Sequence, residues 1–172
     1  HANGYWIHGE GLSTRHIGNF MAVSNVEALE TVRLFELWLE QKFLNDKASV
    51  RFGQLAADSE FFVSNYAGQF INGTFGWPAY MAADLPNGGP AYPLATPGIR
   101  LKLDPTPSLT LLAAVFNGDP AGPALDAQKA NHYGTSFRVQ DPALVMAEGQ
   151  YRYNQDKGPG GLAGTVRLGG WY

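Results

Sequence analysis

Polar and apolar residues alternate along several short segments of this chain, and this alternation is what most constrains its fold. Between residues 35 and 43, the odd positions are mainly apolar, while the even positions carry charged side chains around Trp38. Successive side chains of a β-strand point to opposite faces of its sheet. Similar alternation recurs over residues 47–56, 99–103, 109–115, 137–140, 145–153 and 166–172, with a weaker pattern at 5–9. The sequence therefore predicts an all-β, antiparallel protein with about eight strands.

The connections between these segments are of two kinds. Short turns are expected at Asn45, at Pro105 and at Pro142. Long connections are expected over residues 11–31, 57–97, 118–134 and 155–164. Transmembrane barrels alternate short periplasmic turns with long external loops. We therefore predict a transmembrane β-barrel that forms one domain over residues 1–172 and is incomplete at its C-terminal end.

A barrel in a bilayer pairs its backbone groups internally, has an apolar exterior and can have a wet interior. A charged side chain that faces lipid at mid-depth costs roughly 2–4 kcal/mol. The charged residues of the predicted strands avoid the apolar faces, as such a barrel requires. The patterning alone also fits a soluble antiparallel sheet with one solvated face, such as a lectin-like carbohydrate-binding module.

Composition excludes several other classes of protein. Charged residues make up only 16 % of the chain and the net charge is −3, so no basic surface for nucleic acid is expected. The absence of cysteine excludes disulfides and cysteine zinc sites. No apolar run of about 18 residues is present, so no transmembrane helix is expected. The four histidines lack the spacing of zinc ligands, and no phosphate-binding loop occurs, so we expect no metal and no cofactor.

The polar faces of the predicted strands supply candidates for the lining of a pore. Aromatic rings together with charged hydrogen-bonding groups suit a site that passes polar solutes. The candidates on strands are Glu36, Trp38, Glu40, Lys42, Arg51, Arg100, Lys102 and Arg138. Two alternatives remain open: Trp38 could lie at the membrane interface or beneath a loop, and the cations could form internal salt bridges that stiffen the wall.

The segment 57–97 is too long to be a simple cap, and loops of this length are usually functional or disordered. Its many aromatic residues argue against disorder, and Ser59 could begin a short helix over residues 59–70. We expect this external loop to fold inward and narrow the pore. The residues expected near the constriction are Asp58, Glu60, Asn65, Asn72 and Trp77. The alternative is a packed external lid.

Catalytic arrangements are weakly supported. Glu36 and Glu40 would lie about 13 Å apart on one strand face, beyond the ~5–9.5 Å of glycosidase pairs. An outer-membrane hydrolase built on a barrel remains a remote alternative. It would use Ser13 with His16, or Ser136 with His132.

Several segments, in order and over nearly the whole chain, resemble the OprB-type carbohydrate-selective porins. They are SNVEA at 24–28, LFELW at 34–38 with Gln41, RFGQLAADSEF at 51–61, FINGTFGWP at 70–78, GPAYPLATPG at 89–98, VFNGDP at 115–120 and GGWY at 169–172. The resemblance implies the N-terminal half of a barrel of about sixteen strands. It further implies passive diffusion of glucose-like monosaccharides across the outer membrane of a Gram-negative bacterium, without catalysis. The implied partners are sugars and outer-membrane lipid; trimers are common among porins, but no residue here defines an interface.

Overall fold

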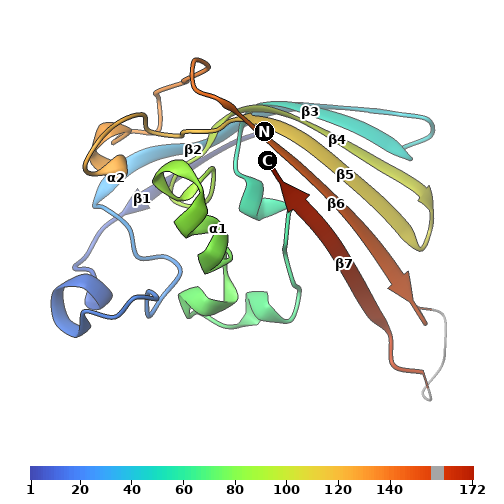
Figure 1. Ribbon diagram of the computed structural model, residues 1–172, viewed down its shortest axis with the longest axis horizontal. Coiled ribbons are helices and arrows are strands. Elements are labelled where there is room, and N and C mark those ends of the chain that lie inside the picture. The colour runs from blue at the N-terminus through green and yellow to red at the C-terminus, as the bar shows by residue number, and fades with distance from the viewer. Residues whose placement is uncertain (156–160) are drawn as a thin grey trace.

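The computed structural model describes residues 1–155 and 161–172, and it contains one antiparallel sheet (Figure 1). Within these residues, seven strands follow one another in sequence order across the sheet. They are β1 (Ala2–Ile7), β2 (Thr31–Phe43), β3 (Ala48–Leu55), β4 (Thr96–Thr106), β5 (Leu109–Asn117), β6 (Ala143–Tyr153) and β7 (Gly164–Trp171). The sheet is open in the described part of the chain, with β1 and β7 at its edges. The prediction of an all-β, antiparallel fold is confirmed.

Two adjacent rows of side chains show how the two faces of the sheet differ. The register aligns Glu40, Arg51, Arg100, Ala114, Met146 and Trp171 across the six strands from β2 to β7. The next row consists of Leu39, Phe52, Ile99, Val115 and Val145, which are all apolar and all exposed. Neighbouring rows point to opposite faces of a sheet. We call the first side the inner face and the second the outer face.

The strand connections lie at two ends of the sheet. The turns β2–β3 and β4–β5 occupy only residues 44–47 and 107–108, and they lie at the end of the sheet that is on the right in Figure 1. The connections β1–β2, β3–β4 and β5–β6 are long and lie at the opposite end. For these five connections, the sorting of short turns from long loops agrees with the sequence expectation.

The prediction of a strand at residues 137–140 is wrong. Asn117 of β5 pairs directly with Ala143 of β6, so residues 118–142 form one long connection. Arg138 binds Asp141 through two hydrogen bonds of 2.9 and 2.7 Å, and Asn117 exchanges two further bonds with Asp141. These contacts fold the segment back on itself, and Pro142 ends the loop rather than making a turn between strands. The β6–β7 connection, expected as a long loop at 155–164, falls at the end with the short turns, and residues 156–160 of that loop lie outside the described residues.

Phe35 lies on the inner face, although the alternation placed it on the apolar face. The register between β1 and β2 shifts between Asn3 and Gly4, so that Phe35 has no partner opposite it. Such a bulge changes which face the following residues occupy. Phe35 is consequently buried, and its ring packs 5.7 Å from that of Tyr92.

The long β3–β4 connection folds into the hollow of the curved sheet (Figure 1). It contains α1 (Ala79–Asp84) and several short 3-10 turns, including Ala57–Ser59, Ala67–Gln69 and Gly73–Phe75. The helix expected over residues 59–70 is therefore wrong. Phe61 and Met81 of this connection pack on Leu112, Phe116 and Met146 of the inner face. None of the helices in the described part of the chain is long and apolar enough to cross a membrane.

Candidate functional site

Four charged residues meet on the inner face where the β3–β4 connection begins. Glu40, Arg51 and Arg100 belong to the inner row described above, and Glu60 reaches them from the connection. We call these four residues the charged cluster. Neighbouring strands are ~4.8 Å apart, so paired positions on one face bring their side chains into contact. The strand register therefore brings Glu40, Arg51 and Arg100 together. The fold of the β3–β4 connection adds Glu60 as the fourth member.

Arg100 is the centre of the charged cluster. Its side chain is only 1 % exposed and binds Glu60 through Nε at 2.6 Å and Glu40 through Nη2 at 2.8 Å. Nη1 donates to the hydroxyl of Ser49 at 2.7 Å. A buried charge is tolerated only when it is paired and hydrogen-bonded, and Arg100 meets this condition on three sides.

Arg51 is the more accessible cation of the cluster. Its Nη2 lies 3.6 Å from Glu40 and its Nη1 lies 3.4 Å from Glu60. Its guanidinium also lies over the ring of Trp38, with Cζ 3.7 Å from the ring centroid. Two arginines thus share two carboxylates, which gives a neutral but strongly polar patch on the wall.

Trp38 does not present a bare aromatic platform. Besides Arg51, the ring of His1 stacks on it with centroids 4.5 Å apart. His1 also places Nε2 3.8 Å from Glu36, which is buried on the inner face. The ring of Trp38 is therefore in contact with both Arg51 and His1.

The remaining strand candidates lie outside the charged cluster. Lys42 is exposed near the β2–β3 turn, opposite Ser49. Lys102 pairs with Asp104 on its own strand, at 3.2 Å. Arg138 lies in the β5–β6 connection, where the adjacent Asp141 raises its pKa. The structure therefore does not bring these three residues together.

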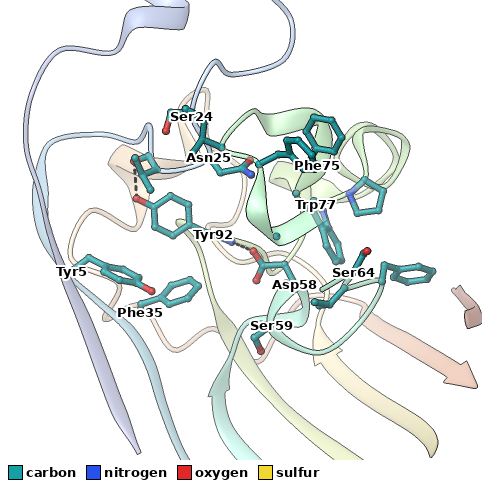
Figure 2. A pocket seen from close by; sticks show the side chains of 18 of the residues that line it. Tyr5, Ser24, Asn25, Phe35, Asp58, Ser59, Ser64, Phe75, Trp77 and Tyr92 are labelled. Carbon is teal, nitrogen blue, oxygen red and sulfur yellow. Dashed lines mark hydrogen bonds between the residues drawn. The ribbon is translucent and has the colours of Figure 1, made fainter. Parts of the chain in front are cut away.

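Asp58 and Trp77 line a separate pocket of about 740 Å³ (Figure 2). We call this space the aromatic pocket, because its walls include Tyr5, Phe35 and Tyr92. Asp58 precedes Glu60 by two residues, yet Asp58 faces this pocket while Glu60 binds the two arginines. Burial raises the pKa of Asp58 to about 6, although the N–H of Tyr92 donates to its carboxylate at 2.9 Å.

Sequence reasoning missed two residues that shape the site. Ser49 binds both Arg100 and Glu40, and its place on the polar face of β3 was the available signal. Glu148 accepts hydrogen bonds from the N–H of Phe62 at 2.6 Å and from Gln150 at 2.8 Å. It thereby ties the β3–β4 connection to β6, a contact that no local pattern indicates.

The candidate nucleophile pairs do not form. Ser13 donates its hydroxyl to Glu27 at 2.7 Å, while His16 lies beside Glu10. The backbone N–H of Ser136 donates to Asn131, and the ring of His132 packs against Tyr133. Outside residues 156–160, no three His, Cys, Asp or Glu side chains are grouped as a metal site would require.

Trp171 lies on the inner face, opposite Met146 of β6. Its Nε1 donates to Asp84 at 2.7 Å, and its ring packs 5.6 Å from that of Tyr80 on α1. This tryptophan therefore helps to hold α1 against the wall.

An antiparallel meander with an apolar outer face and charged side chains on its inner face is the architecture of a porin wall. The family model described as "Carbohydrate-selective porin, OprB family" matches residues 1–172. The chain therefore belongs to the OprB family of carbohydrate-selective porins. This membership confirms the porin class and the outer membrane of a Gram-negative bacterium as its location, and it contradicts the lectin-like and hydrolase alternatives.

Comparison with solved structures gives a likeness to OprB of Pseudomonas putida, in a structure at high pH. The TM-score is 0.71 and the sequence identity is 22 %, over 94 % of this chain and 37 % of the OprB chain. The chain thus spans well under half the length of that protein. A search among curated proteins gives no significant match.

Proposed function

We propose that the inner face lines a water-filled passage through which sugars of the monosaccharide class diffuse passively. The charged cluster carries this proposal, because it is a dense set of hydrogen-bonding groups beneath a loop that folds into the hollow. Arg51, Glu40 and Glu60 offer donors and acceptors to sugar hydroxyls, and the cluster as a whole has no net charge that would favour ions. Binding at such a patch must remain weak enough for release.

The complete passage requires more strands than the seven described here. We propose that further strands pair with the edges β1 and β7 and close a barrel of about sixteen strands. The row from Leu39 to Val145 on the outer face would then contact lipid, which suits its exposed apolar side chains. The loop formed by residues 57–97 would be external and would narrow the passage from one side.

Within the cluster, a passing sugar would meet Arg51, Glu40 and Glu60, since these side chains are more exposed than that of Arg100. The proposed role of Trp38 is to fix the position of Arg51 by contact with its guanidinium. The buried residues Glu36 and Arg100 would support these groups from the wall. Lys42, Lys102 and Arg138 would act at a distance, through the field along the passage.

Liposome swelling with the full-length protein tests the proposal. Vesicles that contain the porin should swell in isotonic glucose at a rate that exceeds the rate for a charged solute of similar size. The variant Glu60→Gln should alter this preference, because it leaves the cluster with an excess positive charge. Equal permeation of sugars and ions of similar size, unchanged by the substitution, would contradict carbohydrate selectivity at this cluster.

A further inference from the structure

The aromatic pocket lies apart from the charged cluster and is built from four segments of the chain. Tyr5 comes from β1, Phe35 from β2 and Asn25 from the connection between those strands. Asp58 and Trp77 come from the β3–β4 connection. The volume of about 740 Å³ lies within the ~300–1,000 Å³ of typical small-molecule sites.

Three aromatic rings form one side of the pocket. The ring of Tyr5 lies 5.3 Å from that of Phe35 and 5.6 Å from that of Tyr92. The hydroxyl of Tyr92 donates to the carbonyl of Val26 at 3.0 Å, which ties this ring to the β1–β2 connection. Aromatic rings in fixed positions offer apolar faces to a ligand at little entropic cost.

Asp58 gives the pocket a polar anchor. Figure 2 shows its carboxylate between the side chains of Tyr92 and Trp77. The N–H of Tyr92 donates to Oδ2 at 2.9 Å, and a carboxylate has lone pairs for about three further bonds. Asn25, Ser24 and Ser64 add amide and hydroxyl groups to the lining.

This combination selects among ligand classes. A purely apolar ligand would bury the carboxylate of Asp58 and remove its hydrogen bonds to water. Because such a ligand supplies no hydrogen bond in return, this burial costs free energy. An anionic ligand would meet the like charge of Asp58. An uncharged pyranose has C–H faces for the rings and hydroxyl donors for the carboxylate.

We propose that the aromatic pocket is a binding site for one uncharged pyranose, distinct from the charged cluster. Asp58 accepts hydrogen bonds from the sugar hydroxyls, and the rings of Tyr5, Phe35 and Tyr92 pack against its C–H face. This inference rests on the proposed function, since it takes sugars as the solutes that reach the pocket. A sugar held there would lie against the same β3–β4 connection that supplies Glu60 to the charged cluster.

The test is saturation-transfer NMR on the full-length porin in detergent micelles, with glucose as the probe. Asp58→Asn keeps an oxygen that can accept the N–H of Tyr92 but removes the charge. We expect this variant to weaken glucose binding about ten-fold, as loss of a charge-assisted hydrogen bond does. Tyr5→Leu, which retains bulk but removes the ring at the pocket wall, should weaken binding as well. Asp46→Asn, in the exposed β2–β3 turn, is the matched control and should bind as the unaltered protein does.

Two outcomes separate this inference from the proposed function. If Asp58→Asn and Tyr5→Leu both fold and bind glucose as tightly as the control, the pocket is not a sugar site, whatever the permeation rate. If glucuronate binds as well as glucose at neutral pH, an uncharged sugar is not the preferred class and the inference is also overturned. A failure of the proposed function appears elsewhere, as absence of glucose-driven swelling in liposomes.

Discussion

The guanidinium of Arg51 lies over the ring of Trp38, with Cζ 3.7 Å from the ring centroid. The sequence placed Trp38 on the charged face of its strand, as a candidate for the lining of the pore. In the structure its ring holds a cation, which also lies within 3.6 Å of Glu40 and 3.4 Å of Glu60. A cation–π contact of this kind contributes about 0.5–2 kcal/mol. The polar wall is thus preorganised by its own side chains.

Replacement of Arg100 should strongly destabilise the protein. Arg100→Met leaves two carboxylates without their closest cation in a poorly solvated place, and removal of one partner from a buried pair costs about 3–5 kcal/mol. The free energy of unfolding, measured by urea titration of the full-length protein in lipid vesicles, should fall by that order. Lys42→Met, which alters an exposed cation, should have little effect. A loss below about 1 kcal/mol for Arg100→Met would show that the cluster is a weak, solvated network.

Glu60→Gln should shift the ion selectivity of the channel toward anions. The substitution leaves two arginines with one carboxylate, so the local charge becomes positive. The reversal potential in a potassium chloride gradient across a planar bilayer reports this change. Asp46→Asn removes the same charge from a turn distant from the cluster, and its reversal potential should match that of the unaltered protein. Identical potentials for the two variants would place Glu60 away from the ion path.

The β3–β4 connection should depend on Phe61 for its position. Phe61 is 1 % exposed and packs against Phe116, with ring centroids 6.2 Å apart. Phe61→Ala should cost about 3–5 kcal/mol of stability and release the connection from the wall. A protease added to intact vesicles should then cut the β3–β4 connection faster. The noise in the open-channel current should also rise. Tyr66→Ala alters an aromatic residue that is 76 % exposed on the same connection, and it should leave both readouts unchanged.

Asp58 should make stability depend on pH between about 4 and 6. Burial raises its pKa from 3.8 to about 6, an effect that the charge of Glu36 reinforces and the N–H of Tyr92 opposes. The folded protein therefore binds this proton more tightly than the unfolded chain. The resulting stabilisation is present in full below pH 3.8 and is lost as the pH rises through about 6. Asp58→Asn should flatten the pH dependence of unfolding in that window, and an unchanged slope would contradict the raised pKa.

Local patterning predicted much of the sheet. Leu39 and Glu40 were assigned to opposite faces because alternation is a property of the strand itself, and the structure places them so. Phe35 was misplaced because the bulge depends on the register with β1, which is not visible in the sequence of β2. Residues 137–140 alternate like a strand, but Arg138 and Asp141 pair across the turn and keep the segment out of the sheet.

The site was predictable only in part. Glu40, Arg51 and Arg100 could be expected on one face, yet their alignment in a single row follows from register. Glu60 was assigned to the constriction together with Asp58, but the fold of the connection sends the two carboxylates to different places. Leu112 and Phe116 interrupted the polar face of β5 because they meet the inward-folded loop, a long-range contact.

The central claim is that one face of this sheet meets water and the other meets lipid, and thiol labelling tests it most directly. The segment contains no cysteine, so Leu39→Cys and Lys42→Cys each place a single thiol in it, on the outer and the inner face. In intact membranes, a charged water-soluble thiol reagent should modify Lys42→Cys quickly and Leu39→Cys hardly at all. Rapid modification of Leu39→Cys, with Lys42→Cys protected, would contradict the account.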